Sequence, residues 1–142
     1  MDTESLLKSL NGHKVDYVII GATAFPIHGY ARATLDIDLF IRPDLQNASR
    51  ALEALKDFGY DVSDLTEEDL LTKKVLIRQY LVETDIHPFV TGITFDQVWQ
   101  NRLPGTYGNE KVYYASLEDL ITMKKAAGRS KDLEDLKILL KL

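Results

Sequence analysis

The sequence predicts a single domain of the α/β class, with strands and helices mixed along the chain. Two observations carry this prediction. Short apolar, β-branched runs that are typical of buried strands alternate with segments in which apolar residues recur at helical spacing. The chain has 142 residues, about the length of one domain, and no repeat or flexible linker divides it.

The first half of the chain contains five segments with clear patterns. Leu6 and Leu10 recur at helical spacing, and Gly21 and Gly29 follow segments that they are expected to end. Asp44 is a favourable N-cap residue for the longest helical pattern. We therefore expect a helix over residues 5–10, a buried strand over 15–20, a compact helical segment over 22–28, a strand over 35–41 and a helix over 45–58.

The second half has weaker patterns up to its last quarter. Thr66 begins a sequence typical of a capping box, and Ser116 is placed to cap a helix that Gly128 interrupts. The expected elements are a short helix after residue 66, one or two strands over 75–86, a helix over 94–101, a turn-rich segment over 103–109, a strand over 111–115, and a C-terminal pair of helices over 116–141.

Composition and charge exclude several classes of protein. With 45% hydrophobic and 27% charged residues, the chain is not disordered or of low complexity. The net charge of −5 argues against a protein that binds mainly to nucleic-acid backbones. The absence of cysteine excludes a disulfide framework and a cysteine zinc site. The N-terminus is acidic and no apolar stretch is long enough to cross a bilayer, so we expect a soluble cytoplasmic protein.

Two carboxylates in the second predicted strand indicate a metal site. Asp36 and Asp38 are two residues apart, so in a strand they point to the same face, about 6.6–6.8 Å apart. Carboxylates this close repel each other unless a cation lies between them. Hard oxygen ligands suit Mg²⁺ or Mn²⁺, which also bind substrate phosphates. Most Asp-x-Asp pairs are nevertheless solvated strand edges, so the pair alone is a weak signal.

The turn after the first predicted strand adds a second, phosphate-binding feature. A strand that ends in Gly21 and leads directly into a helix presents free backbone N–H groups to an anion. Ala22 leaves the approach open, and Thr23 could add a hydroxyl donor. Together with Asp36 and Asp38, this turn describes a metal-dependent phosphoryl or nucleotidyl transfer site.

The whole segment from Gly21 to Ile41 resembles the minimal nucleotidyltransferases of the polymerase-beta-like superfamily. In their pattern a strand is followed by Gly-Gly or Gly-Ser opening a helix, then by an Asp-x-Asp strand. Residues 28–34, His-Gly-Tyr-Ala-Arg-Ala-Thr, are similar to a subgroup of small nucleotidyltransferase-like proteins related to abortive-infection and toxin–antitoxin systems. Residues 116–124 and 132–136 resemble the C-terminal pattern of that group, so the resemblance spans roughly residues 15–140.

The resemblance implies a nucleotidyltransferase-type mixed sheet flanked by helices, with residues 1–142 forming the domain. It implies transfer of an NMP from an NTP to a hydroxyl on RNA, a protein or a small molecule. Asp36 and Asp38 would hold the metal, and Lys124 would neutralise the triphosphate. A third acid is expected late in a later strand, where Glu83 and Asp85 are both candidates. We prefer Asp85 as catalytic residue and metal ligand, because a bend at His87-Pro88 follows it.

Other residues near these motifs have structural as well as functional interpretations. Arg32 either pairs with Asp36 or Asp38, or contacts phosphate. Arg129 and Asp132 are expected to form a structural pair, His28 to bond the backbone, and Thr34 to brace its loop. Phe95 and Trp99 are expected to share one apolar helix face.

Three classes of function remain open at this point. The leading hypothesis is the metal-dependent nucleotidyltransferase. Because Ala22 replaces the family's second Gly or Ser, the alternative is an inactive module that acts as an antitoxin or regulatory binding partner. RNA binding would depend on the Lys73-Lys74 and Lys124-Lys125 pairs alone. The chain is too short for a separate acceptor domain, so we expect the acceptor to be held by the C-terminal helices, a second copy in a homodimer, or a partner protein.

Overall fold

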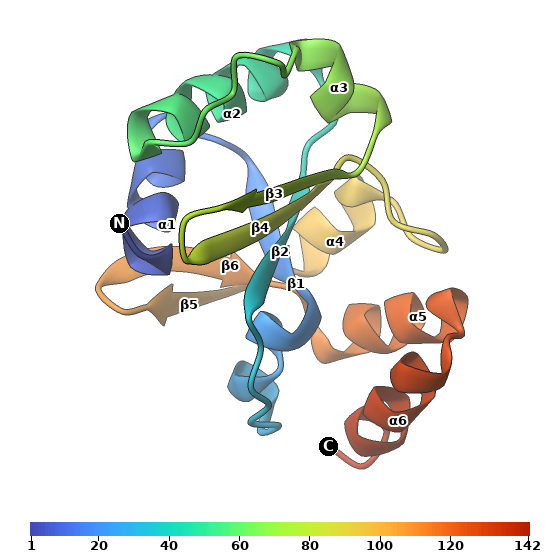
Figure 1. Ribbon diagram of the computed structural model, residues 1–142. Coiled ribbons are helices and arrows are strands. Elements are labelled where there is room, and N and C mark those ends of the chain that lie inside the picture. The colour runs from blue at the N-terminus through green and yellow to red at the C-terminus, as the bar shows by residue number, and fades with distance from the viewer.

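A six-stranded mixed sheet forms the centre of the molecule (Figure 1). A computed structural model describes all 142 residues. The strands run in the spatial order β3-β4-β2-β1-β6-β5. Their bounds are β1 Tyr17–Ile20, β2 Asp36–Ile41, β3 Val75–Gln79, β4 Val82–His87, β5 Leu103–Tyr107 and β6 Glu110–Tyr114. β1 and β2 are antiparallel, whereas β2 pairs with β4, and β1 with β6, in parallel.

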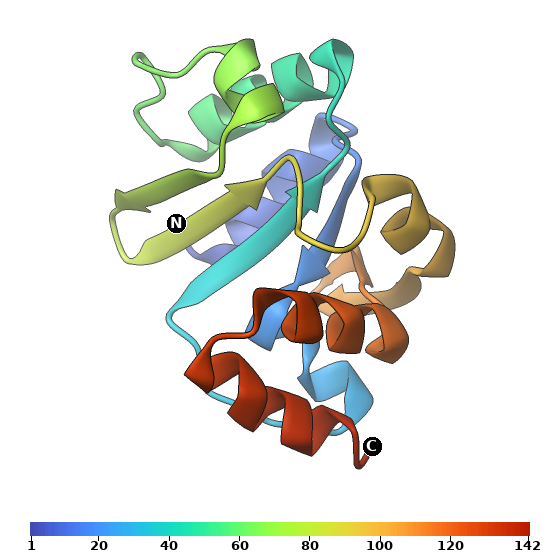
Figure 2. The same cartoon turned by 90° about the vertical axis from the view of Figure 1, so that its right-hand side faces the viewer.

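Six α-helices and two 3₁₀ turns surround the sheet. They are α1 Thr3–Gly12, η1 Gly21–Ala24, η2 Pro26–His28, α2 Leu45–Phe58, α3 Glu67–Thr72, α4 Phe95–Asn101, α5 Leu117–Ala127 and α6 Ser130–Leu139. α1 and α2 pack against each other on one side of the sheet, and α5 and α6 form a separate pair near the end of β1 (Figures 1 and 2). None of the helices has the length and hydrophobicity that crossing a membrane requires. The predicted α/β class is therefore confirmed.

Alternation along β2 and β4 separates a core face from a site face. On β2, Ile37, Leu39 and Ile41 are buried, whereas Asp36 and Asp38 are only half-buried on the opposite face. Side chains also alternate between the two faces along β4, but its core face includes the buried hydroxyl of Thr84. The Tyr60 side chain lies beside this hydroxyl, at 2.9 Å, and donates to the Val82 carbonyl. This buried contact fixes β4 relative to the loop after α2.

Two expectations from the sequence were wrong in detail. Residues 103–109 were expected to be turns, but Leu103–Tyr107 is the edge strand β5. An edge strand tolerates Pro104, because only one side of it needs backbone donors. Residues 22–28 form two 3₁₀ turns rather than one helix. Pro26, which lacks an N–H and fixes its own φ, begins the second turn and prevents a continuous helix.

Candidate active site

The parallel pairing of β2 with β4 gathers acidic side chains on the site face. Asp36 is opposite Glu83 and Asp38 is opposite Asp85 in the register, so two pairs of acids lie side by side. One ligand oxygen from each of Asp36, Asp38 and Asp85 can be chosen so that all three lie within 4.8 Å of one another. The structure therefore brings together the three carboxylates that the sequence suggested as a triad.

Glu83 is not part of this cluster, although it shares the face. Its side chain is 40% exposed, and its nearest ionic partner is Arg78, with Nε 3.8 Å from Oε2. Asp85, by contrast, is buried. Of the two candidates for the third acid, Asp85 is the one that the fold places beside Asp36 and Asp38.

The clustered carboxylates hold their protons unequally. Burial raises the pKa of Asp85, and the negative charges of Asp38 and Asp36 raise it further, although Arg78 opposes this. Burial also acts to raise the pKa of Asp36, but hydrogen bonds from Thr34 and from the Asp85 carboxyl outweigh it, so this pKa is lowered. Acids this close cannot all be charged without a compensating cation.

The turn after β1 brings backbone to the same place. Gly21 has a φ of +70°, and a Cβ on it would lie 2.6 Å from Oδ2 of Asp38. Only glycine combines this conformation with so close an approach. Gly21 and Ala22 line a cavity of about 150 Å³ together with Asp36, Asp38 and Asp85. The expected juxtaposition of a backbone turn with clustered acids is thus present in one cavity.

Thr23 is placed beside this cavity rather than in its lining. Its hydroxyl is directed to the backbone carbonyl of Asp36, at 3.5 Å. Thr34 braces the same loop as expected, with Oγ1 donating to the Asp36 carbonyl at 3.0 Å. His28 also bonds the backbone as expected, with Nε2 2.8 Å from the Ala115 carbonyl. Phe95 and Trp99 share one helix face and stack on each other, with centroids 5.5 Å apart.

The cations that the sequence assigned to phosphate are engaged by two buried acids of α6. Arg32 Nη1 lies 2.9 Å from Asp135 Oδ2, so its partner is neither Asp36 nor Asp38. Lys124 Nζ lies 3.2 Å from both Asp132 Oδ1 and Asp135 Oδ2. Both cations line the cavity, and both also fasten α6 to the rest of the molecule.

The expected pair of Arg129 and Asp132 is present, with Nε 2.7 Å from Oδ2. Asp132 is fully buried, which acts to raise its pKa, but the bonds from Arg129 and Lys124 outweigh burial. The resulting pKa is lowered from 3.8 to about 2, so this carboxylate stays charged inside the C-terminal helix pair.

Four residues of the site were not assigned to it from the sequence, Arg78, His87, Lys131 and Asp135, and Lys74 was named only as part of a possible RNA-binding pair. His87 Nε2 lies 2.8 Å from Asp38 Oδ1 and orients that carboxylate. Its position two residues after Asp85 could have placed it on the site face. Lys74 and Lys131 line the carboxylate cavity and form no ion pair, so their charges are available to an anion.

A second, larger cavity adjoins the first. It has a volume of about 320 Å³ and shares five residues with the carboxylate cavity: Gly21, Asp38, Lys74, Lys124 and Arg129. Its remaining lining is mainly apolar and comes from β1, the loop after β4, and α5: Ile20, Phe89, Val90, Leu120, Met123 and Ala127. A cavity lined mainly by charged and polar residues therefore adjoins a cavity with a large apolar part.

The structure combines a mixed sheet, a carboxylate cluster and a glycine turn. This is the arrangement expected of a nucleotidyltransferase. Residues 1–139 match the model of a family described as a nucleotidyltransferase of unknown function (DUF6036), and the chain belongs to this family. Comparison with curated proteins gave no match.

Proposed function

We propose that the protein is a metal-dependent nucleotidyltransferase of the polymerase-beta-like type, which transfers an NMP from an NTP to a hydroxyl acceptor. The observation that carries this proposal is the convergence of Asp36, Asp38 and Asp85 within 4.8 Å, beside the backbone of Gly21. Membership of a nucleotidyltransferase family supports it independently.

The carboxylate cluster fits a divalent metal. Three hard oxygen donors converge, and burial together with the neighbouring charges of Asp38 and Asp36 raises the pKa of the Asp85 carboxyl, so a cation would stabilise its charged form. Mg²⁺ and Mn²⁺ prefer such donors and retain water or phosphate oxygens in their other positions. Asp36, Asp38 and Asp85 would hold the metal, which would supply charge neutralisation at the reacting phosphate oxygens.

The surrounding residues would position the two reactants. The backbone of Gly21 and Ala22, with the free charges of Lys74 and Lys131, would bind the phosphates. His87 would keep Asp38 in its orientation. Asp85 would orient the attacking hydroxyl and accept its proton. The hydroxyl oxygen bonds to the α-phosphorus while the bond from this phosphorus to the oxygen bridging to the β-phosphate breaks, and pyrophosphate departs.

The adjoining apolar cavity would hold the nucleoside. Phe89 lines this cavity and is 60% exposed, so its aromatic ring is available to stack on a base. We expect Phe89→Ala to weaken NTP binding about ten-fold, because base–aromatic stacking contributes about 1–3 kcal/mol. Mg²⁺ affinity without nucleotide should be unchanged. Isothermal titration with each ligand separates the two effects, and equal losses for metal and nucleotide would contradict this assignment.

Labelled NTPs with candidate acceptors test the reaction itself. Asp36→Asn and Asp38→Asn should each lower transfer at least about 100-fold, because each removes a ligand of the metal. Glu83→Gln is the matched control: it removes an acid from the same face outside the cluster, and should stay within a few-fold of wild type. In Mg²⁺ titrations, Asp36→Asn and Asp38→Asn should likewise bind the metal much more weakly than wild type, whereas Glu83→Gln should bind it about as well. Equal activity in all variants would reject the proposal.

One observation favours a second candidate, a non-catalytic module that binds a partner as an antitoxin or regulator. Arg32 and Lys124, the cations expected to face the triphosphate, are both paired with Asp135. A protein that forms a stable complex with a partner protein, and binds neither Mg²⁺ nor any NTP, would support this second function instead.

A further inference from the structure

One arginine extends over the carboxylate cluster from the edge of the sheet. Arg78 is on β3, opposite Glu83 in the antiparallel pairing of β3 with β4, and therefore projects from the site face. Its guanidinium contacts three acids. Nη1 lies 2.6 Å from Asp85 Oδ1, Nη2 lies 3.9 Å from Asp36 Oδ2, and Nε lies 3.8 Å from Glu83 Oε2.

This guanidinium is the only Lys or Arg group that forms an ion pair with Asp36, Asp38 or Asp85. The other cations of the cavity either pair with α6 acids or stand free. The hydrogen bond to Asp85 raises the pKa of Arg78, so it is charged at any working pH. Arg78 thus supplies the cluster's positive charge from within the chain.

We propose that Arg78 is a built-in counter-cation that competes with the divalent metal for Asp85. This inference rests on the proposed function, because it concerns the same carboxylates. In the metal-free protein the Arg78–Asp85 contact stabilises the cluster. Metal binding requires this contact to be released, so Arg78 lowers the metal affinity of the site.

The surroundings of Arg78 permit such a release. Its side chain is 42% exposed and is carried by the outermost strand of the sheet, so it can swing into solvent without disturbing the core. Lys124, in contrast, is held by two buried acids and is only 15% exposed. Of the two cations, Arg78 is the one that can move.

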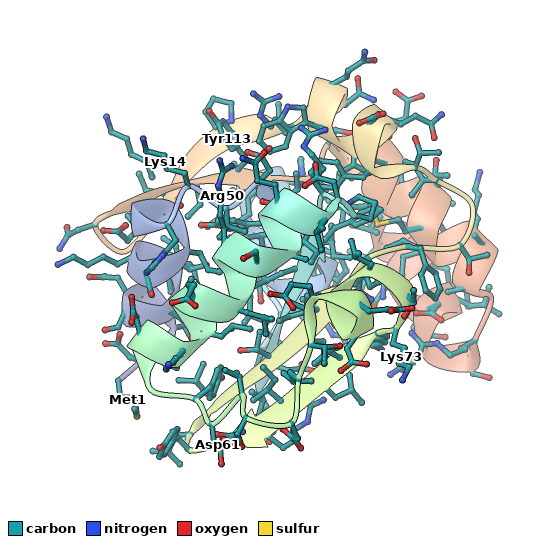
Figure 3. The ribbon with its side chains drawn as sticks, turned by 90° about the horizontal axis from the view of Figure 1, so that it is seen from above. Met1, Lys14, Arg50, Asp61, Lys73 and Tyr113 are labelled. Atoms are coloured by element: carbon teal, nitrogen blue, oxygen red, sulfur yellow. The ribbon has the colours of Figure 1, made fainter.

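Mg²⁺ and Mn²⁺ titrations by calorimetry, at fixed ionic strength and without nucleotide, test the competition. Arg78→Gln should bind the metal about five-fold more tightly than wild type, as expected for removal of a partly exposed ion pair. Arg78→Lys keeps the charge and should stay within about two-fold of wild type. Arg50→Gln removes one positive charge from α2, where Arg50 forms no ion pair, and should leave the affinity unchanged (Figure 3).

A second measurement uses the wild-type chain, so it does not depend on how a variant folds. The Arg78 Nε–H signal in an NMR spectrum should shift or broaden in proportion to bound Mg²⁺, while the Arg50 signal stays in place. An Arg78 signal that is insensitive to saturating metal would overturn the proposal. So would an Arg78→Gln affinity equal to, or weaker than, that of wild type.

The two proposals fail in distinguishable ways. If wild type binds metal, Asp38→Asn does not, and Arg78→Gln matches wild type, the competition is rejected and the transferase proposal stands. If neither wild type nor Arg78→Gln binds metal, both proposals are rejected. If only Arg78→Gln binds metal, the competition is supported in its strongest form.

Discussion

At the scale of single residues, Gly21 connects the two parts of the site. Its left-handed φ of +70° turns the chain out of β1, and its missing side chain admits the carboxylate of Asp38. The other oxygen of the Asp38 carboxylate, Oδ1, lies within hydrogen-bond distance of His87. A side chain at position 21 would therefore act on the metal site through Asp38, as well as on the backbone.

We predict that Gly21→Ala costs about 1–2 kcal/mol of folding free energy, the usual cost of a left-handed conformation for an L-residue. It should also weaken Mg²⁺ binding, because the new Cβ displaces Asp38. Gly12→Ala is the control: a Cβ there meets no atom within 4 Å. Urea unfolding and metal titration measure the two effects. Equal behaviour of the two variants would show that the close approach to Asp38 has no consequence.

The residue scale also shows what sequence alone can predict. That Asp36 and Asp38 share a face follows from alternation within one strand. The third acid could be predicted only as one of two residues, Glu83 or Asp85. Arg78 and the partners of Arg32 could not be predicted. Their contacts depend on which strands and helices become neighbours, and local patterns do not determine that.

At the scale of elements, α6 is unusual because it buries two acidic side chains and exposes leucines. Its buried residues include Asp132 and Asp135, whereas Leu133 and Leu140, the residue after its end, are 49% and 56% exposed. The acids face Lys124, Arg129 and the loop before β2, so α6 is fastened by ion pairs as well as by the buried Leu139. An amphipathic pattern would have predicted the opposite orientation.

The lowered pKa of Asp132 makes this attachment depend on pH. Because the folded-state pKa, about 2, is below the ordinary value of 3.8, the stabilisation is complete above about pH 4 and is lost as pH falls toward 2. The shift corresponds to about 2 kcal/mol. Asp132→Asn should destabilise by about 3 kcal/mol at pH 7, because Lys124 and Arg129 lose their buried partner.

Denaturant unfolding between pH 2 and 7 checks this prediction. The difference between wild type and Asp132→Asn should shrink as pH falls from about 4 to about 2. Glu134→Gln, which removes an exposed acid from the same helix, should change stability by less than about 1 kcal/mol. A difference between wild type and Asp132→Asn that stays constant over this pH range would contradict the assigned role.

Element boundaries were predicted best where caps and glycines mark them. The helix over residues 45–58 begins after the Asp44 cap and ends at Gly59. The strand β5 was missed because Pro104 and Gly105 are local turn signals, whereas its pairing with β6 depends on the whole sheet. The broken helix at Pro26 has a local cause instead, because proline lacks an N–H and fixes its own φ.

At the scale of the whole molecule, the two cavities lie where the sheet meets the α5–α6 pair. The larger cavity takes residues from β1, β4 and α5, so a ligand there would contact both the sheet and the helix pair. A ligand that binds the folded state but not the unfolded state raises the free energy of unfolding, and the gain grows with the logarithm of the ligand concentration.

Mg²⁺ with a non-hydrolysable NTP should therefore raise the melting temperature. At about 100 times the dissociation constant the gain is about 2.7 kcal/mol, which is roughly 5–10 °C for a domain of this size. Asp38→Asn should show almost no shift under the same conditions. A shift of equal size in this variant would mean that the nucleotide binds elsewhere.

The hydroxyl pair of Tyr60 and Thr84 has a consequence for how this sheet can misassemble. Thr84 and Asp85 are adjacent on β4 and point to opposite faces. A slip of β4 by one residue would separate the Thr84 hydroxyl from Tyr60 and turn a carboxylate toward the core. Both errors are costly, so the Tyr60–Thr84 contact disfavours a sheet in which β4 is paired out of register. The register that buries Thr84 on the core face is therefore also the register that places Asp85 beside Asp36 and Asp38 on the site face.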